Sequence, residues 1–301
     1  MPPMSAPLQF DRALLAVRRQ RAALGEPADF LLRHVADDLA DRLSLVQRSF
    51  ARIVDLGSPT DALREALAGR GLAMPIGTET AAGLAPRRAT PVVVTHTDAL
   101  PFANGSLDLV VSALALQLVD DLPGVFVQVC RALKPDGLFL AALLGGDTLT
   151  ELRQAFAAAE SEVEGGLSPR VAPFADIRDI GALLQRAGFA LPVTDADTLT
   201  VRYGDVFALM RDLRAMGAAN PLAQRRRTPL RRATLMRMAA IYHERFADPD
   251  GRIRATFQVV TLSGWSPHES QQQPLKPGSA KARLADALKA IELPTGEKPG
   301  G

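Results

Sequence analysis

The stretch IVDLGSPTDALREAL, residues 53–67, decides the fold. It begins as the apolar run Ile53-Val54 and turns at Asp55-Leu56-Gly57. It then continues as a helix, for which we predict Ser58 as the N-cap and Pro59 in the first turn. A strand, a glycine turn and a helix in this order form the opening unit of nucleotide-binding α/β domains, whose ligands lie at the carboxyl ends of the strands. We therefore expect a binding site directly after Asp55.

Short apolar runs alternate with helical patterns on both sides of this stretch. Strands are predicted at residues 72–76, 91–95, 107–112 and 138–144, and helices at 30–46 and 121–133. The run at 138–144 is apolar throughout, as expected for a strand buried on both faces. This alternation predicts an α/β fold with a doubly wound, mostly parallel sheet.

The pattern changes after Gly145-Gly146. Helices are predicted at 148–162, 176–187 and 206–216, with one more ending at Phe246, and strands at 198–203 and 255–262. We therefore divide the chain into an N-terminal helical segment (1–47), an α/β core (48–146) and an extension of completing strands and helices (147–270). Residues 271–301 are rich in Gln, Pro, Gly and Lys and are predicted to form a disordered tail.

Composition excludes several classes of function. The net charge of the 301 residues is +2, which gives no indication of nucleic-acid binding. Cys130 is the single cysteine, so a disulfide framework and a cysteine-cluster metal site are excluded. The apolar runs fall short of the ~18 residues that a membrane span needs. No apolar segment precedes Arg18-Arg19, so no signal peptide is predicted, and we expect a cytoplasmic protein without membrane insertion.

Several motifs carry a resemblance to known families. The runs 98–102 (DALPF), 107–112 (LDLVVS) and 133–137 (LKPDG) resemble the Rossmann-like core of class I S-adenosylmethionine (SAM) methyltransferases. Further motifs, 145–149 (GGDTL), 164–169 (EGGLSP) and those around Trp265 and His268, resemble the methyltransferase-like assembly factors of respiratory complex I. Members of that family act as protein-arginine hydroxylases on an iron–sulphur subunit. A more distant resemblance is to the malonyl-carrier-protein methyltransferase of biotin synthesis.

The resemblance implies four cofactor-binding residues. Asp55 and Gly57 match the first two positions of the SAM motif, which reads Asp-x-Gly-x-Gly-x-Gly. Glu79 matches the acidic residue that accepts the ribose hydroxyls, and Asp98 matches the carboxylate that accepts the adenine amino group. Carboxylates suit these roles because they only accept hydrogen bonds. For Glu79, a solvated loop charge is the alternative.

Two glycines of the SAM motif are absent. Pro59 and Asp61 stand in their places; the first lacks an N–H group, and the second brings a negative charge toward the carboxylate of SAM. Two such charges about 5 Å apart at an effective dielectric near 20 repel by about 3 kcal/mol, or about a hundredfold in affinity. We therefore expect SAM binding to be weak or lost.

Four residues are candidates for contact with the substrate. Asp147, Glu151 and Arg153 follow the strand at 138–144, where the cleft should open, and Asp147 could bind a substrate guanidinium group or cap a helix. Gln117 stands where many relatives have a histidine. A glutamine can orient a guanidinium group but cannot act as a general base, and a solvent-facing helix position is its alternative.

No metal site is predicted. His96 and Asp98 have the spacing that begins a two-histidine-one-carboxylate iron site, with His243 or His268 as a third ligand, but Asp98 is assigned to adenine. We predict a protein substrate, a complex I iron–sulphur subunit, contacted by a surface that includes Asp147, Trp265 and His268. The alternatives are a methyltransferase that acts on a small molecule or carrier protein, and a non-catalytic assembly chaperone with a degraded SAM site.

Overall fold

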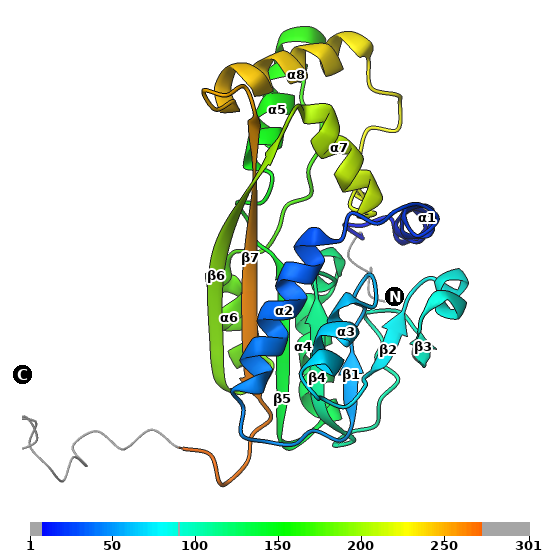
Figure 1. Ribbon diagram of the computed structural model, residues 1–301, viewed down its shortest axis with the longest axis vertical. Helices are drawn as coiled ribbons and strands as arrows, with labels where there is room; N and C mark the ends of the chain where they lie inside the picture. Colours follow the sequence, from blue (N-terminus) through cyan, green and yellow to red (C-terminus); the bar gives the residue numbers. More distant parts are fainter. Residues whose placement is uncertain (1–7, 90, 273–301) are drawn as a thin grey trace, which may run out of the picture. The chain divides into compact units, whose positions relative to one another are not determined.

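The computed structural model describes residues 8–89 and 91–272, which form a seven-stranded sheet with the order β3-β2-β1-β4-β5-β7-β6 (Figure 1). The strands are β1 (Ile53–Asp55), β2 (Ile76–Glu79), β3 (Val92–Val94), β4 (Leu107–Ala113), β5 (Leu133–Leu144), β6 (Ala190–Tyr203) and β7 (Ile253–Trp265). β1 to β5 pair in parallel, and β7 runs antiparallel to both β5 and β6. The prediction of a doubly wound, mostly parallel sheet is confirmed.

Helices cover both faces of the parallel strands. α2 (Phe30–Ser44) and α3 (Ala62–Gly69) pack on one face, against the side chains of Leu109 and Leu140. α4 (Leu122–Ala132) and α6 (Ile177–Arg186) pack on the other, against Val110 and Phe139. Neighbouring residues of β4 and β5 therefore point into different cores, which explains the continuous apolar runs at 109–111 of β4 and 138–144 of β5.

The extension is built on a ribbon of two strands. The pairing of β5 with β7 ends at Leu144 and Val259, whereas β6 and β7 remain paired as far as Tyr203 and Ile253. Three helices pack around the projecting part of the ribbon: α5 (Thr150–Glu164), α7 (Val206–Ala215) and α8 (Arg232–Phe246) (Figure 1). α1 (Arg12–Ala22) contacts α7, so the N-terminal segment reaches the extension as well as the core. Helices at both ends of the core confirm the predicted N-terminal segment and C-terminal extension.

Two element boundaries differ from the prediction near β1. α3 starts at Ala62 rather than Pro59, and Ser58 is not its N-cap, because the Ser58 hydroxyl accepts a hydrogen bond from Ala113 N at 3.0 Å. The second strand is 76–79 rather than 72–76. Leu72 instead closes α3 in a Schellman motif: Gly71 has φ +75°, and Leu72 N donates to Leu67 O at 3.1 Å.

β6 is longer than predicted. It starts at Ala190 rather than Thr198, and its first half carries the charged residues Asp195 and Asp197. As the outermost strand of the sheet it exposes every second side chain, and charged residues on an edge strand discourage pairing with other chains. Because of these polar residues, the first half of β6 has no apolar run from which a strand could be predicted.

Residues up to Pro267 form one compact unit, and His268 begins a second. Of the second unit the structure describes 268–272, a turn in which His268 N donates to Gln271 Oε1 at 3.1 Å. The rest of the predicted disordered tail lies outside the described residues. Within the described ranges, no helix is long and apolar enough to cross a membrane.

Candidate functional site

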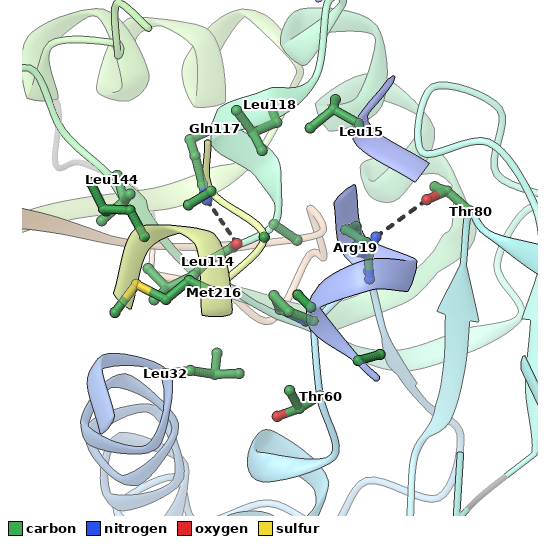
Figure 2. A pocket seen from close by; sticks show the side chains of 18 of the residues that line it. Leu15, Arg19, Leu32, Thr60, Thr80, Leu114, Gln117, Leu118, Leu144 and Met216 are labelled. Carbon is green, nitrogen blue, oxygen red and sulfur yellow. Dashed lines mark hydrogen bonds between the residues drawn. The ribbon is translucent and has the colours of Figure 1, made fainter. Parts of the chain in front are cut away.

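A pocket of about 520 Å³ opens at the carboxyl ends of the parallel strands (Figure 2). α1 and α2 line one part of its wall, and the loops after β1, β2, β3 and β4 line another. The extension contributes apolar side chains, among them Leu149, Phe174 and Met216. The volume lies in the range of cofactor and small-molecule sites, and the lining is mostly apolar with a few polar groups.

The loop after β1 brings backbone to the edge of this pocket. Gly57 has φ +75°, a conformation that favours glycine, and a β-carbon there would lie 3.3 Å from the β-carbon of Ala115. Pro59 and Thr60 also line the pocket, so the loop has the predicted position. Asp61 differs from the expectation. Its carboxylate binds Arg64 and Arg88 and accepts a hydrogen bond from Ala89 N at 3.1 Å, and it is not part of the pocket wall.

The pairing of Asp61 corrects the electrostatic argument made from the sequence. Two guanidinium groups offset the carboxylate charge, so a repulsion of about 3 kcal/mol against a cofactor carboxylate is not expected from this geometry. Of the two substituted glycine positions, Pro59 remains as the one that changes the pocket wall.

Asp55 lies beneath the pocket in a buried ion pair. Its side chain is 1% exposed, and Oδ2 lies 3.4 Å from Nε of Arg64, which is 2% exposed. Burial raises the pKa of Asp55, and hydrogen bonding by Ser58 and the charge of Arg64 oppose this only in part. Gly77 makes the arrangement possible, because a β-carbon there would collide with the Arg64 guanidinium group.

Glu79 ends β2 and is fully buried. Its carboxylate binds Arg88 Nη2 at 2.7 Å and Arg19 Nη2 at 3.3 Å, and it accepts a hydrogen bond from Ala81 N at 3.1 Å. The alternative of a solvated loop charge is therefore wrong. The carboxylate that the family resemblance assigns to the ribose hydroxyls is held between two arginines.

Asp98 lies in the pocket wall, on the loop after β3. The loop is anchored to α4, since Gln128 Nε2 donates to Asp98 O at 2.7 Å and Leu100 N donates to Gln128 Oε1 at 2.9 Å. The Asp98 carboxylate forms an ion pair with Arg12 of α1, which also contacts Asp120 at 3.2 Å. Like Glu79, the expected adenine acceptor is therefore bound to an arginine of α1.

The pocket residues can be tested against a SAM-type cofactor. Pocket volume and the Gly57 loop suit a nucleoside. The two carboxylates do not, because both acceptor groups already bind guanidinium groups in this conformation. In this conformation the two acceptor groups therefore do not fit the cofactor.

Gln117 is the one substrate candidate of the four that lines the pocket. Its Nε2 donates to Leu114 O at 2.7 Å, which fixes the amide group (Figure 2). The Oε1 atom is buried and accepts no hydrogen bond from the described residues. A buried acceptor without a donor is costly, so Oε1 is suited to accept an N–H from a ligand.

Asp147, Glu151 and Arg153 lie outside the pocket wall and bind other parts of the protein. Glu151 is buried and accepts hydrogen bonds from Thr256 of β7, at 3.1 Å from N and 2.5 Å from Oγ1. Asp147 is exposed and accepts from Gln258 Nε2 at 3.2 Å. Arg153 donates to Thr148 O at 3.2 Å. The structure therefore brings these three to the junction of β5, α5 and β7.

Trp265 lies at the opposite end of the sheet, where the parallel strand β5 begins. It pairs with Leu138, near the start of β5, whereas Asp147 follows the carboxyl end of β5. Its ring lies 6.0 Å from the Arg48 guanidinium carbon. The expectation of one surface formed by Asp147 and Trp265 is wrong, because the length of β5 separates them.

His96 and Asp98 both line the pocket, and His243 lies in α8. The part of the chain that the structure describes contains no group of three or more His, Cys, Asp or Glu side chains placed to hold a metal ion.

The arginines that bind the carboxylates of the site were not predicted from the sequence. Arg12, Arg19, Arg64 and Arg88 all bind carboxylates at or beneath the pocket. A spacing of seven residues places Arg12 and Arg19 on one face of α1, and this was the available signal. Nothing in the spacing indicates which carboxylates they meet.

Comparisons with known proteins place these observations in context. A family model described as a methyltransferase domain matches residues 29–192. The arginine-hydroxylase NDUFAF5 of Danio rerio, named as mitochondrial, is 37% identical over 292 residues, which cover 94% of this chain and 91% of that protein. The human protein of the same name is 38% identical over 298 residues, covering 96% and 86%. A malonyl-[acyl-carrier protein] O-methyltransferase of Laribacter hongkongensis is 37% identical over 289 residues, covering 89% and 91%.

Solved structures share the fold. A putative methyltransferase of Bacillus halodurans aligns with a TM-score of 0.54 at 11% identity and covers 77% of this chain and 99% of its own. The YcgJ protein of a Bacillus species aligns with a TM-score of 0.53 at 13% identity, covering 78% and 99%. At these identities the likeness concerns the fold alone.

Proposed function

Because this chain belongs to the methyltransferase-domain family and to the family of the arginine hydroxylases named NDUFAF5, we propose that it hydroxylates an arginine of a protein substrate. The observation that carries the proposal is the similarity to these hydroxylases along nearly the whole chain, which spans the core, α1 and the extension. The class I SAM methyltransferase fold supplies the scaffold.

The pocket supports recognition of a guanidinium group. The methylene part of an arginine side chain suits the apolar wall, and its N–H groups suit Gln117 Oε1, the buried acceptor without a donor.

We further propose that the substrate is an iron–sulphur subunit of respiratory complex I and that the protein acts in the assembly of this complex. The motif series between Gly145 and Ser270 supports this part. A SAM-type cofactor that binds weakly or not at all also belongs to the proposal, supported by the paired states of Glu79 and Asp98. So does a cytoplasmic location, which fractionation of tagged protein would test against the mitochondrial names of the vertebrate relatives.

The proposal is tested by mass spectrometry of complex I from cells with and without this protein. Hydroxylation by dioxygen consumes two electrons from a reductant, so the assay is made in cells rather than with the isolated chain. We expect one arginine of an iron–sulphur subunit to carry one additional oxygen atom only when the protein is present. If no arginine modification depends on it, the proposal is wrong.

Gln117→Ala tests the role of the pocket in the same assay. Loss of a hydrogen bond to a charged group costs about 1.5–3 kcal/mol, so the extent of modification should fall about tenfold or more. Gln154→Ala is the matched control, because Gln154 is exposed on α5, outside the pocket wall, and its side chain donates to Thr150 Oγ1 on the same helix. Equal modification with both variants would remove Gln117 from the proposal.

The similarity to the malonyl-[acyl-carrier protein] methyltransferase supports a second candidate, methyl transfer from SAM to a carrier-bound carboxylate. Incubation of the purified protein with SAM and malonyl-carrier protein distinguishes the two candidates. Formation of the methyl ester would favour the second.

A further inference from the structure

α1 presents two arginines to the pocket. Arg12 and Arg19 are seven residues apart, lie on one face of the helix and both line the pocket. Arg12 binds Asp98, and Arg19 binds Glu79 at 3.3 Å. Arg19 also donates to Thr80 Oγ1 at 3.2 Å (Figure 2). One helix therefore binds both carboxylates that a nucleoside would need.

The backbone of α1 is held in place by other contacts. Asp11 caps the helix by accepting from Leu14 N at 3.0 Å, and it binds Arg225 at 3.0 Å. Phe10 is buried beside Leu222, and Arg18 donates to Ala219 O at 2.8 Å. None of these contacts involves Arg12 or Arg19, so both side chains can rotate away while the helix stays where it is.

In the ion pair between Arg19 and Glu79, the Glu79 carboxylate is shielded from water. Glu79 is fully buried, whereas the Arg19 side chain is 19% exposed. Burial lowers the pKa of the Arg19 guanidinium group, and the charge of Glu79 raises it. A ligand can reach Glu79 only when Arg19 leaves, because Arg88 and Ala81 N occupy its remaining contacts.

We propose that Arg12 and Arg19 are affinity-setting residues that compete with an adenosine-type ligand for Asp98 and Glu79. The ribose hydroxyls would take the place of Arg19, and the adenine amino group that of Arg12. This inference rests on the nucleoside site in the proposed function. In this proposal the two α1 arginines, and not Asp61, weaken the binding of the cofactor.

Titration calorimetry with S-adenosylmethionine and S-adenosylhomocysteine tests the inference on the full chain. Arg19→Ala and Arg12→Ala should each lower the dissociation constant about tenfold, which corresponds to about 1.4 kcal/mol, and the double variant should lower it further. Arg19→Lys keeps a charge near Glu79 and should recover part of the competition. Arg21→Ala, exposed on the same helix and outside the pocket wall, is the matched control and should bind as the unchanged protein does.

Three outcomes would overturn the inference: unchanged affinity, weaker affinity, or no nucleoside binding by either variant at millimolar ligand. Weaker affinity would mean that the arginines hold the ligand. Thermal unfolding checks that each variant is folded, and Arg19→Gln replaces Arg19→Ala if the latter is not. The proposed function fails separately: arginine modification could be absent from complex I while the variants still bind nucleosides more tightly.

Discussion

Arg64 is the largest of the fully buried side chains among the described residues, and it lies between Asp55 and Asp61. Removing one partner of a buried ion pair leaves the other charge without compensation, which costs about 3–5 kcal/mol. Arg64→Ala should therefore lower the free energy of unfolding by about that amount in urea titrations at pH 7.5. A loss below about 1 kcal/mol would show that water compensates Asp55.

The loss should depend on pH. Burial raises the pKa of Asp55 above its ordinary value of 3.8, and removal of Arg64 raises it further. Between 3.8 and the raised pKa, the folded state binds a proton that the unfolded state does not, so the contribution to stability falls as pH rises through this window. The deficit of Arg64→Ala should therefore shrink from pH 7.5 to pH 5. Parallel pH curves for the two proteins would contradict this.

Single residues show how far the sequence could predict the site. Gly57, Asp98 and Gln117 lie in the pocket wall, where the sequence placed them, and their roles stay predictions. The ion pairs of Glu79 and Asp98, the two carboxylates that the family resemblance assigns to the cofactor, could not be predicted. They depend on Arg12 and Arg19, whose partners are 86 and 60 positions away in the sequence, respectively.

At the scale of elements, the junction between β5 and α5 is attached to β7. Thr148 Oγ1 accepts from Gln258 N at 3.1 Å, and Leu149, with φ +55°, donates from its N to Thr256 O at 2.7 Å. The GGDTL motif at 145–149, which carries part of the family resemblance, thus fixes the start of α5 to the projecting ribbon. This attachment orients Leu149 toward the pocket wall.

The junction yields a contrast between two neighbouring carboxylates. Glu151→Ala leaves the partly buried N–H group of Thr256 without its acceptor and should lower the free energy of unfolding by about 1–3 kcal/mol. Asp147→Ala removes an exposed contact and should change it by less than about 0.5 kcal/mol. Chemical denaturation measures both. Equal losses would mean that Asp147 carries more of the junction than its exposure indicates.

Strands with continuous apolar runs could be predicted from the sequence, and the part of an edge strand that carries charged residues could not. β4 and β5 were found from apolar runs because both of their faces are buried. The first half of β6 was missed because an edge strand tolerates Asp195 and Asp197. The start of α3 was misplaced because Ser58 has the residue type of an N-cap but its hydroxyl bonds β4 instead.

At the scale of the whole molecule, the composition after residue 272 predicts that the C-terminal stretch contributes little to stability. Removal of residues 273–301 should change the melting temperature by less than about 2 °C, because few apolar residues are available for burial. Differential scanning calorimetry of the shortened and full chains measures this. A fall of about 10 °C would show that the stretch packs on the rest of the protein.

The strand order has a consequence for how the chain is made. Among the strands that the structure describes, β7 is the last to be synthesised, yet it lies between β5 and β6. While the ribosome has released only the residues before 253, β5 has an open edge of unpaired N–H and C=O groups, and β6 has no neighbour to pair with. The nascent chain therefore carries an open sheet edge from the completion of β5 at Leu144 until β7 follows, a state that favours aggregation and chaperone binding. The sheet can be completed only after β7, which ends at Trp265, has left the ribosome.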